Sequence, residues 1–271
     1  MTGNDRGLAI EVCDLVANYG ARRILDGVSM NVRHGEIMVI MGGSGSGKST
    51  LLRHLLGLST PRSGTIRLLG QDLAACDAEA RYRMRRNVGV SFQGGALLSS
   101  LTVGENVALP LREHTELDES TISIIVRLKL EVVNLGGFEH LYPAQLSGGM
   151  IKRAALARAI AMDPKLLFFD EPSAGLDPVV SSELDDLILK LRESLRMTIV
   201  VVTHELESAF KIADRITVLD HGRILIEGDR ESVRNSSIER VQDLFQRRSR
   251  PFEISADDYL RRLTGASRDA T

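Results

Sequence analysis

Short apolar runs alternate with longer amphipathic segments along most of the chain. Four of the runs are apolar at nearly every position, which is typical of strands covered on both faces of a sheet. They are Ile37–Met41, Val88–Phe92, Leu166–Phe169 and Met197–Val202. A fifth run, Ile216–Leu219, is followed by a glycine-containing turn and then by Arg223–Ile226, which predicts a β-hairpin. The alternation of these runs with helical patterns predicts an α/β fold.

The pattern changes between residues 94 and 163, where helical periodicity replaces the buried strands. We expect this segment to be a helical insertion in an α/β core formed by residues 8–93 and 164–228. The polar residues 1–7 predict a flexible N-terminus. From residue 229 the chain becomes more charged, and we expect a C-terminal extension over residues 229–271.

Composition narrows the class of protein. Hydrophobic residues make up 43% and charged residues 26% of the 271 residues, as in an ordinary globular protein. With a net charge of −2, the protein lacks the overall positive potential that is typical of proteins that bind nucleic acid. No apolar run approaches the ~20 residues that cross a bilayer, and the N-terminus lacks the apolar stretch of a signal peptide. Cys13 and Cys76 have no metal-ligand spacing, so we expect reduced thiols in a soluble, cytoplasmic protein.

A glycine-rich segment, GGSGSGKS from Gly42 to Ser49, fits the pattern G-x-x-x-x-G-K-[ST]. It lies between the buried run that ends at Met41 and a predicted helix over Lys48–Leu56. Glycines let successive backbone N–H groups point at phosphate oxygens, and the helix N-terminus adds the positive end of its dipole. Lys48 would reach the β- and γ-phosphates of ATP, and the Ser49 hydroxyl would bind Mg²⁺. The expected phosphate-binding residues are Gly42, Gly43, Ser44, Gly45, Ser46, Gly47, Lys48, Ser49 and Thr50.

Two carboxylates follow the apolar run Leu166–Phe169. In open α/β sheets, ligands bind at the carboxyl ends of the strands. Asp170 would hold Mg²⁺ through water, and Glu171 would orient the attacking water or accept its proton. Together with the phosphate-binding loop upstream, this pair predicts hydrolysis of a bound nucleotide.

The stretch LSGGM, from Leu146 to Met150, places a serine and two glycines at the start of a predicted helix over Met150–Met162. Ser147 is a favourable N-cap, and Gly148 and Gly149 leave backbone N–H groups open to a second anion. One nucleotide does not need two such sites in one chain. A head-to-tail pair of copies, in which this turn closes over the phosphates held by the other copy, uses both.

These motifs make the chain resemble the ATP-binding-cassette family from about Ile10 to Gly228. Two further motifs of the family are present, Ser173–Asp177 (SAGLD) and Val202–His204 (VTH). The resemblance implies a P-loop NTPase core, which is a RecA-like sheet with flanking helices, together with an antiparallel β subdomain and a helical insertion. It also implies ATP and Mg²⁺ as cofactors, and a separate membrane permease as partner.

The resemblance assigns further site residues. Tyr19 would stack on the adenine, and Gln93 would sense the γ-phosphate and Mg²⁺ while touching the membrane partner. Asp177 would pair across the dimer, and His204 would contact the γ-phosphate. Met150 stands where the family commonly has glutamine, and its sulfur is only a weak acceptor. Because one neutral hydrogen bond contributes about 0.5–1.5 kcal/mol, we expect a site that is altered in rate but active.

Within the family, the chain is most similar to the ATPases of Mla-type phospholipid transporters. The similarity lies in LSGGM followed by Lys152–Ile160, in Phe92–Leu98, in Glu105–Leu111, and around Val241, Phe245, Pro251 and Phe252. It implies phospholipid trafficking between the inner and outer membranes through a multi-span permease. It also implies a Mce-domain protein and a small STAS-domain protein as partners, and a peripheral location on the cytoplasmic face of the inner membrane.

The C-terminal sequence leaves two interpretations open. Arg247–Pro251 is typical of a linker, and Ser255–Leu263 has the pattern of a short helix. The extension is either a solvated tail or a docking segment for the second copy or the STAS protein. The apolar residues that would dock are Phe252, Ile254, Tyr259 and Leu260.

Other functions remain as alternatives. The same ATPase chemistry would serve a transporter for another small solute. A soluble cassette protein acting on nucleic acid is disfavoured, because the chain has one cassette, no sustained heptads and acidic residues between the arginines of its tail. A regulator that only binds nucleotide would lack Glu171 or His204, and both are present.

Overall fold

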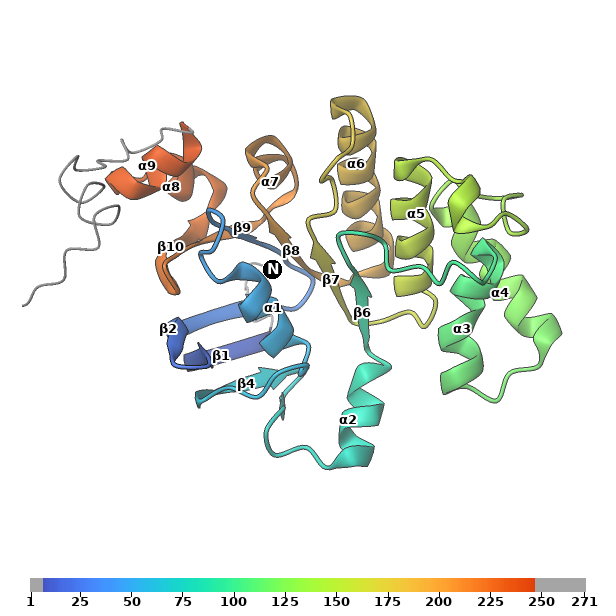
Figure 1. Cartoon of the computed structure of the whole chain (residues 1–271), viewed down its shortest axis with the longest axis horizontal. Coiled ribbons are helices and arrows are strands. Elements are labelled where there is room, and N and C mark those ends of the chain that lie inside the picture. Colours follow the sequence, from blue (N-terminus) through green and yellow to red (C-terminus); the bar gives the residue numbers. More distant parts are fainter. Residues whose placement is uncertain (1–6, 247–271) are drawn as a thin grey trace, which may run out of the picture. The chain divides into compact units, whose positions relative to one another are not determined.

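The computed structural model describes residues 7–246, and the chain divides into two compact units after Ser236 (Figure 1). The first unit holds every element from β1 to α8, and helix α9 (Glu239–Phe245) belongs to the second. The predicted linker at Arg247–Pro251, the predicted helix at Ser255–Leu263 and the proposed apolar docking residues lie outside the described residues.

A six-stranded sheet forms the centre of the first unit, in the order β10-β9-β3-β8-β7-β6. Its strands are β3 (Ile37–Met41), β6 (Val88–Ser91), β7 (Leu166–Asp170), β8 (Thr198–Thr203), β9 (Arg215–Asp220) and β10 (Arg223–Asp229). The strands from β9 to β6 pair in parallel, and β10 pairs antiparallel with β9 as the predicted hairpin. All five residues of β3 are buried, as expected for a strand covered on both faces.

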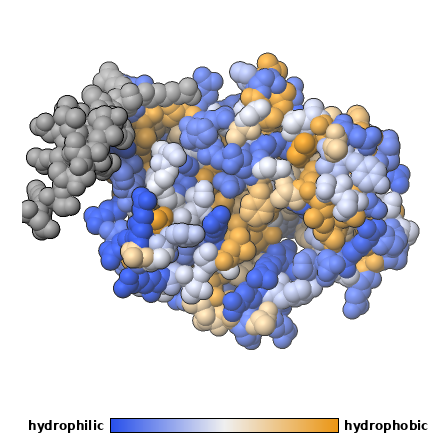
Figure 2. Space-filling view, viewed as in Figure 1, coloured by the Kyte–Doolittle hydropathy of each residue, from blue (hydrophilic) through white to orange (hydrophobic). Residues whose placement is uncertain are grey.

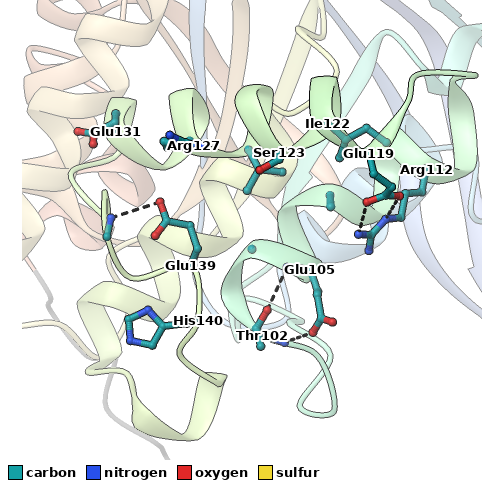
Figure 3. A pocket seen from close by; sticks show the side chains of 14 residues that line it. Thr102, Glu105, Arg112, Glu119, Ile122, Ser123, Arg127, Glu131, Glu139 and His140 are labelled. Atoms are coloured by element: carbon teal, nitrogen blue, oxygen red, sulfur yellow. Dashed lines mark hydrogen bonds and ion pairs between the residues drawn. The ribbon is translucent and has the colours of Figure 1, made fainter.

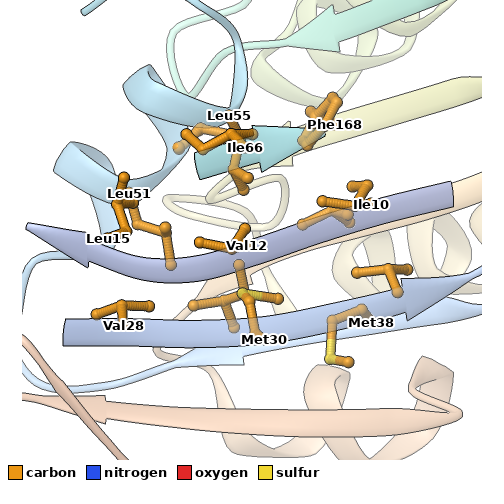
Figure 4. Close-up of a cluster of buried hydrophobic side chains, with 14 of the residues drawn as sticks. Ile10, Val12, Leu15, Val28, Met30, Met38, Leu51, Leu55, Ile66 and Phe168 are labelled. Atoms are coloured by element: carbon orange, nitrogen blue, oxygen red, sulfur yellow. The ribbon is translucent and has the colours of Figure 1, made fainter. Parts of the chain in front are cut away.

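A second, antiparallel sheet has the order β2-β1-β4-β5. Its strands are β1 (Leu8–Tyr19), β2 (Arg22–Arg33), β4 (Ser63–Leu68) and β5 (Gln71–Asp72). The main hydrophobic cluster joins both sheets to helix α1 (Lys48–Leu55). Figure 4 shows Ile10 and Met30 of this sheet in one cluster with Leu51 of α1 and Phe168 of β7. This cluster fixes α1, and therefore the loop in front of it, against the central sheet.

The hydrophobic pattern alone predicted no strand in residues 8–33, and only the family resemblance implied this sheet. Pairing of β1 with β2 shifts register several times, for example between Val12 and Leu15. At that irregularity Asp14 adopts a left-handed φ of 47°. Each shift interrupts the strict alternation of apolar and polar residues by which a half-buried strand is recognised.

Residues 94–163 form helices and turns. They contain α3 (Val103–His114), α4 (Glu119–Val132), the 3₁₀ turn η1 (Pro143–Gln145) and α5 (Gly148–Ala159). Figure 1 shows α3, α4 and α5 packed side by side at one end of the unit. Thr102, Asp118 and Ser147 cap the three helices through their side chains, so each helix start is determined locally.

The remaining helices are α2 (Ala78–Arg85), α6 (Pro178–Leu195), α7 (Leu206–Ile212) and α8 (Arg230–Arg234). Helix α8 belongs to the first unit, and Arg230 donates to the carbonyl oxygens of Phe210 and Lys211 at the end of α7. The first unit therefore continues beyond Gly228, the boundary expected from the sequence. Within residues 7–246, every helix is too short or too polar to cross a membrane.

Gly89 in β6 provides a test of how closely α5 packs on the sheet. A Cβ atom at this position would lie 2.2 Å from the carbonyl oxygen of Ala159, the last residue of α5. We expect Gly89→Ala to lower the free energy of unfolding by about 1–3 kcal/mol, because backbone must shift to admit the methyl group. Gly94→Ala is the matched control, since its Cβ would meet no atom within 4 Å. Urea unfolding of both variants checks this, and equal stabilities would contradict the close packing.

Candidate nucleotide-binding site

The carboxyl ends of four parallel strands bring the predicted site residues to one edge of the central sheet. The phosphate-binding loop follows β3, Gln93 comes two residues after β6, Glu171 follows β7, and His204 follows β8. The register pairs Met41 with Thr203 and Asp170 with Val202, so these strand ends are level with one another. This edge is where ligands bind in open α/β sheets.

The loop between β3 and α1 admits only glycine at two positions. A Cβ on Gly42 would lie 2.2 Å from the carbonyl oxygen of Leu219. Gly47 has a φ of 110°, and its Cβ would lie 2.8 Å from a methyl group of Leu25. The loop is therefore held close to β9 and β2, and its path around a bound group is determined by the protein.

The start of α1 has the features of an anion site. Gly47 occupies the N-cap and provides no side-chain acceptor, so the first N–H groups of α1 are not capped by a side chain at that position. The buried hydroxyl of Ser46 has no hydrogen-bond partner among the described residues. A buried polar atom without a partner is uncommon in proteins, and a phosphate oxygen at this position would provide one.

Lys48 extends over the loop. Its Nζ atom donates to the carbonyl oxygens of Gly42 at 2.8 Å and Gly43 at 3.1 Å. Burial lowers the pKa of the Lys48 ammonium, while the nearby charges of Glu171 and Asp170 act to raise it. The side chain therefore places a positive charge beside the loop and the two carboxylates.

Asp170 and Ser49 provide oxygen atoms of the kind that Mg²⁺ prefers. Burial raises the pKa of the Asp170 carboxyl, the charge of Glu171 raises it further, and Lys48 opposes both. Among residues 7–246 there is no cluster of three or more His, Cys, Asp or Glu side chains that would hold a metal by itself. This donor set fits Mg²⁺, which is usually bound by one or two protein groups together with water and nucleotide phosphates.

Glu171 is held firmly by its surroundings. Its side chain is only 12% exposed, and its Oε2 atom accepts hydrogen bonds from the Thr203 hydroxyl at 3.2 Å and the His204 backbone N–H at 3.4 Å. The His204 Nδ1 atom lies 2.9 Å from the Glu171 carboxylate. Glu171 also has a left-handed φ of 49°, which is costly for a residue with a side chain and is kept only where contacts enforce it.

The LSGGM turn lies beside the start of α6. The Ser147 hydroxyl caps α5 by accepting from the Met150 N–H at 3.3 Å, and Gly148 is exposed. The nearest atom to a Cβ on Gly149 belongs to Val180 of α6. Asp177 caps α6 through hydrogen bonds from the N–H groups of Val179 and Val180. These groups form a second cluster, and none of these contacts involves the phosphate-binding loop of the same chain.

Several predicted residues are open to solvent. Tyr19, at the end of β1, is 82% exposed, which leaves its ring free to stack on a base. The His204 side chain is 61% exposed. Gln93 is exposed as well, and its backbone carbonyl accepts a hydrogen bond from Lys152.

Sequence reasoning missed Lys152, Arg158 and Thr203. Lys152 of α5 donates to the carbonyl oxygens of Gln93 and Glu171, and Arg158 donates to those of Gly95 and Ala96. A readable signal existed for Lys152. Lys152 precedes the buried residues Ala155 and Leu156 by three and four positions. This spacing places its charged side chain on the buried face of α5.

A groove of about 380 Å³ lies next to Gln93, between β6 and the helices α2, α3 and α5. Figure 2 shows hydrophobic side chains gathered in the hollow beside β6. Apolar lining comes from Val88, Val90, Phe92, Leu109, Pro110 and Met162. Three arginines (Arg85, Arg86 and Arg158) and one acidic residue, Glu113, also line it. The groove therefore lies beside Gln93, the residue that the family resemblance assigns to contact with the membrane partner.

A larger cavity of about 670 Å³ lies within the helical segment, between α3 and α4 (Figure 3). Several of its charged groups have partners inside the protein. Glu105 completes the capping box with Thr102, and Arg112 forms two hydrogen bonds with Glu119. These pairs stabilise the helix ends, and we assign this cavity no ligand.

The family model described as "ABC transporter" matches residues 25–174, which is more than half of the chain. The intermembrane phospholipid transport system ATP-binding protein MlaF of Haemophilus influenzae is 41% identical over 257 residues, covering 94% of this chain and 97% of that protein. The chain belongs to the ABC transporter family. The predicted family and the ATPase activity are confirmed, and the chain therefore binds ATP, as ABC ATPases do.

Two further relatives of this ABC ATPase inform its function. The probable ribonucleotide transport ATP-binding protein mkl of Mycobacterium leprae is 43% identical over 225 residues, covering 83% of this chain but 65% of that protein. A dimeric ATP-binding cassette, MJ0796, in a post-hydrolysis state bound to ADP and phosphate, superimposes with a TM-score of 0.75 at 31% identity. That match covers 81% of this chain and 98% of the cassette, and it confirms the predicted P-loop NTPase fold class.

Met150 gives a test of the LSGGM turn in this ABC ATPase. The cap of α5 uses the backbone N–H of Met150 and does not depend on the half-buried side chain. We expect Met150→Gln to change kcat/KM for ATP by less than about tenfold, the equivalent of one neutral hydrogen bond. Steady-state ATPase assays with Met162→Gln as a control away from the turn check this. A change of a hundredfold would mean that the methionine has a specific role.

Proposed function

We propose that this ABC ATPase drives the trafficking of phospholipid between the inner and outer membranes through a separate permease. The observation that carries the proposal is the 41% identity to MlaF of H. influenzae over 97% of that protein. The mycobacterial relative named for ribonucleotide transport is as similar in identity, but this chain spans only 65% of its length. Similarity over the whole of a relative, including its C-terminal part, is the stronger support. Transport of another small solute is the second candidate function.

The site geometry supports a division of roles in hydrolysis. The residues from Gly42 to Thr50 bind the phosphates, with Lys48 at the β- and γ-phosphates and Tyr19 against the adenine. Glu171 accepts the proton of the attacking water, because its carboxylate is fixed by Thr203 and His204 at the edge where the phosphates lie. The exposed His204 ring contacts the γ-phosphate.

Ser49, Asp170 and Gln93 would hold Mg²⁺ at the same edge. The ion, when bound with ATP, neutralises negative charge that develops on the phosphate oxygens. Partial burial raises the pKa of the Asp170 carboxyl, and a nearby cation would stabilise its charged form. Gln93 has an exposed side chain and follows Phe92, which lines the groove, so it lies between the proposed metal site and the groove.

Two copies would complete two sites. The phosphate-binding loop and the LSGGM turn each begin a helix whose first N–H groups favour an anion, and they form separate clusters within one chain. In a head-to-tail dimer, Ser147, Gly148 and Gly149 of one copy close over the phosphates held by the other, and Asp177 lies at the same interface. The related cassette with ADP and phosphate is a dimer, which supports this arrangement.

The permease would dock in the groove next to Gln93. Its apolar walls suit an amphipathic helix, and its three arginines suit acidic residues on that helix. A Mce-domain protein and a small STAS-domain protein would complete the assembly on the cytoplasmic face of the inner membrane. The C-terminal extension is an additional surface for the second copy or the STAS protein.

Two substitutions test the roles of Lys48 and Glu171. We expect Lys48→Ala to abolish measurable ATPase activity, because the phosphates lose the half-buried cation proposed to bind them. Glu171→Gln should lower kcat by about 10²–10⁴-fold while ATP still drives dimerisation, because only the proton acceptor is lost. ATPase assays and size-exclusion chromatography with ATP measure both effects. The exposed α6 variants Lys190→Ala and Glu193→Gln are controls. Parental hydrolysis by Glu171→Gln would refute its role as the base.

The cargo is tested by purifying the tagged protein from its native membranes in mild detergent, followed by mass spectrometry of proteins and lipids. We expect a multi-span permease, a Mce-domain protein and bound phospholipid to co-purify. Recovery of a permease with a solute-binding protein would favour the second candidate function. Recovery without any membrane protein would refute a role in transport.

A further inference from the structure

Lys152 is a buried cation that the roles above do not use. It lies in the second turn of α5, and only 8% of the residue is exposed. Lysine side chains usually reach solvent, and burying their charge is costly unless the ammonium is well hydrogen-bonded. Burial lowers the pKa of Lys152, while the charges of Glu171, Asp170 and Glu205 act to raise it. The charge of Lys152 is therefore stabilised by groups of the nucleotide site and not by water.

Both hydrogen bonds of Lys152 go to backbone carbonyl oxygens at the catalytic edge. One acceptor is the carbonyl of Glu171, 3.2 Å away, and the other is the carbonyl of Gln93. These two residues follow different strands and are far apart in the sequence. Because carbonyl groups carry no net charge, they satisfy the ammonium without neutralising it, and its positive charge still acts to lower the pKa of Asp170.

The Glu171 backbone needs such support. Its left-handed φ of 49° is unfavourable for a glutamate and persists only when neighbouring groups enforce it. The Glu171 N–H donates to the Val202 carbonyl at 2.8 Å, which holds one side of the residue. Lys152 holds the other side through the Glu171 carbonyl, so both flanking peptide groups are fixed.

The same helix also holds the loop after Gln93. Arg158 donates to the carbonyl oxygens of Gly95 at 2.8 Å and Ala96 at 2.7 Å. Lys152 and Arg158 together bind three carbonyl groups within four residues of this loop. The loop therefore follows α5, and Lys152 is the residue that also connects α5 to Glu171.

We propose that Lys152 is a positioning residue that sets the orientation of Glu171 and Gln93 from the helix that begins with the LSGGM turn. Lys152 is five residues from Ser147, or about 7.5 Å along α5. The turn proposed to contact the other copy's nucleotide is therefore connected through α5 to Glu171, the proposed catalytic base of its own chain. This inference rests on the proposed role of Glu171 and adds the residue that orients it.

Three variants test the proposal in the full-length chain. Lys152→Met keeps the length of the side chain and removes the donors, and Lys152→Arg keeps the charge and the donors. Lys190→Met makes the same change at an exposed lysine of α6. We expect Lys152→Met to lower kcat by about 10–100-fold with KM for ATP within about threefold, because hydrogen bonds from a charged donor are lost. Lys152→Arg should recover most of the rate, and Lys190→Met should match the parent.

A second readout separates positioning from a general structural role. In the Glu171→Gln background, Lys152→Met should still form the ATP-driven dimer, because phosphate binding does not use Lys152. Unchanged kcat in Lys152→Met would overturn the proposal, as would a joint loss of ATP binding, dimerisation and rate. If Lys152→Met fails to fold in a thermal scan, Lys152→Gln replaces it with the same criteria. The Glu171→Gln variant tests the proposed function separately. If it loses hydrolysis while Lys152→Met keeps the parental kcat, the proposed function stands and only the role of Lys152 is refuted.

Discussion

The parallel pairing of β3 with β8, and of β8 with β7, is the constraint on which the site depends. It brings residues that are more than a hundred positions apart in the chain to one level at one edge of the sheet. The strands cannot slip by one residue without moving every side chain to the opposite face, and both faces are buried. The phosphate-binding loop, the two carboxylates and His204 therefore have fixed relative heights before any nucleotide binds.

Helix α5 has a larger role than its capped start suggests. Its N-terminus presents Ser147 and Gly148, and its second turn binds the carbonyl groups of Gln93 and Glu171. Its C-terminus lies against Gly89 of β6. One helix thus contacts the turn proposed to meet the other copy, the catalytic edge and the strand next to the proposed permease groove. A transporter ATPase needs communication among these three places.

The sequence predicted those parts whose signals are local. The loop from Gly42 to Ser49 is a continuous motif, and β3, β7 and β8 are recognisable because central strands are apolar on both faces. Tyr19 and Gln93 entered only through the family resemblance, since an aromatic residue or a glutamine at a strand end has no pattern of its own. Their roles, like those of the other site residues, stay predictions.

The parts that the sequence did not predict depend on contacts between distant segments. The register shifts of β1 and β2 arise from pairing, and the partners of Lys152 come from two other strand ends. Helix α6 was not predicted either, although its start has a local signal in the sequence. Asp177 is its N-cap, and Pro178 follows at the first helical position. A search for helix starts, in addition to apolar periodicity, would have found it.

The close approach of Gly89 to the end of α5 gives this helix a fixed point on the sheet. No room is left for even a methyl group between Gly89 and Ala159, so the two backbones are in direct contact there and any tilt of α5 would pivot about this contact. The 12 residues of α5 place Ser147 about 18 Å from this pivot. A tilt of about 10° would then displace Ser147 by about 3 Å, which is the length of a hydrogen bond. In the proposed head-to-tail dimer, small rotations of the helical segment would therefore be sufficient to engage or release a phosphate held by the other copy.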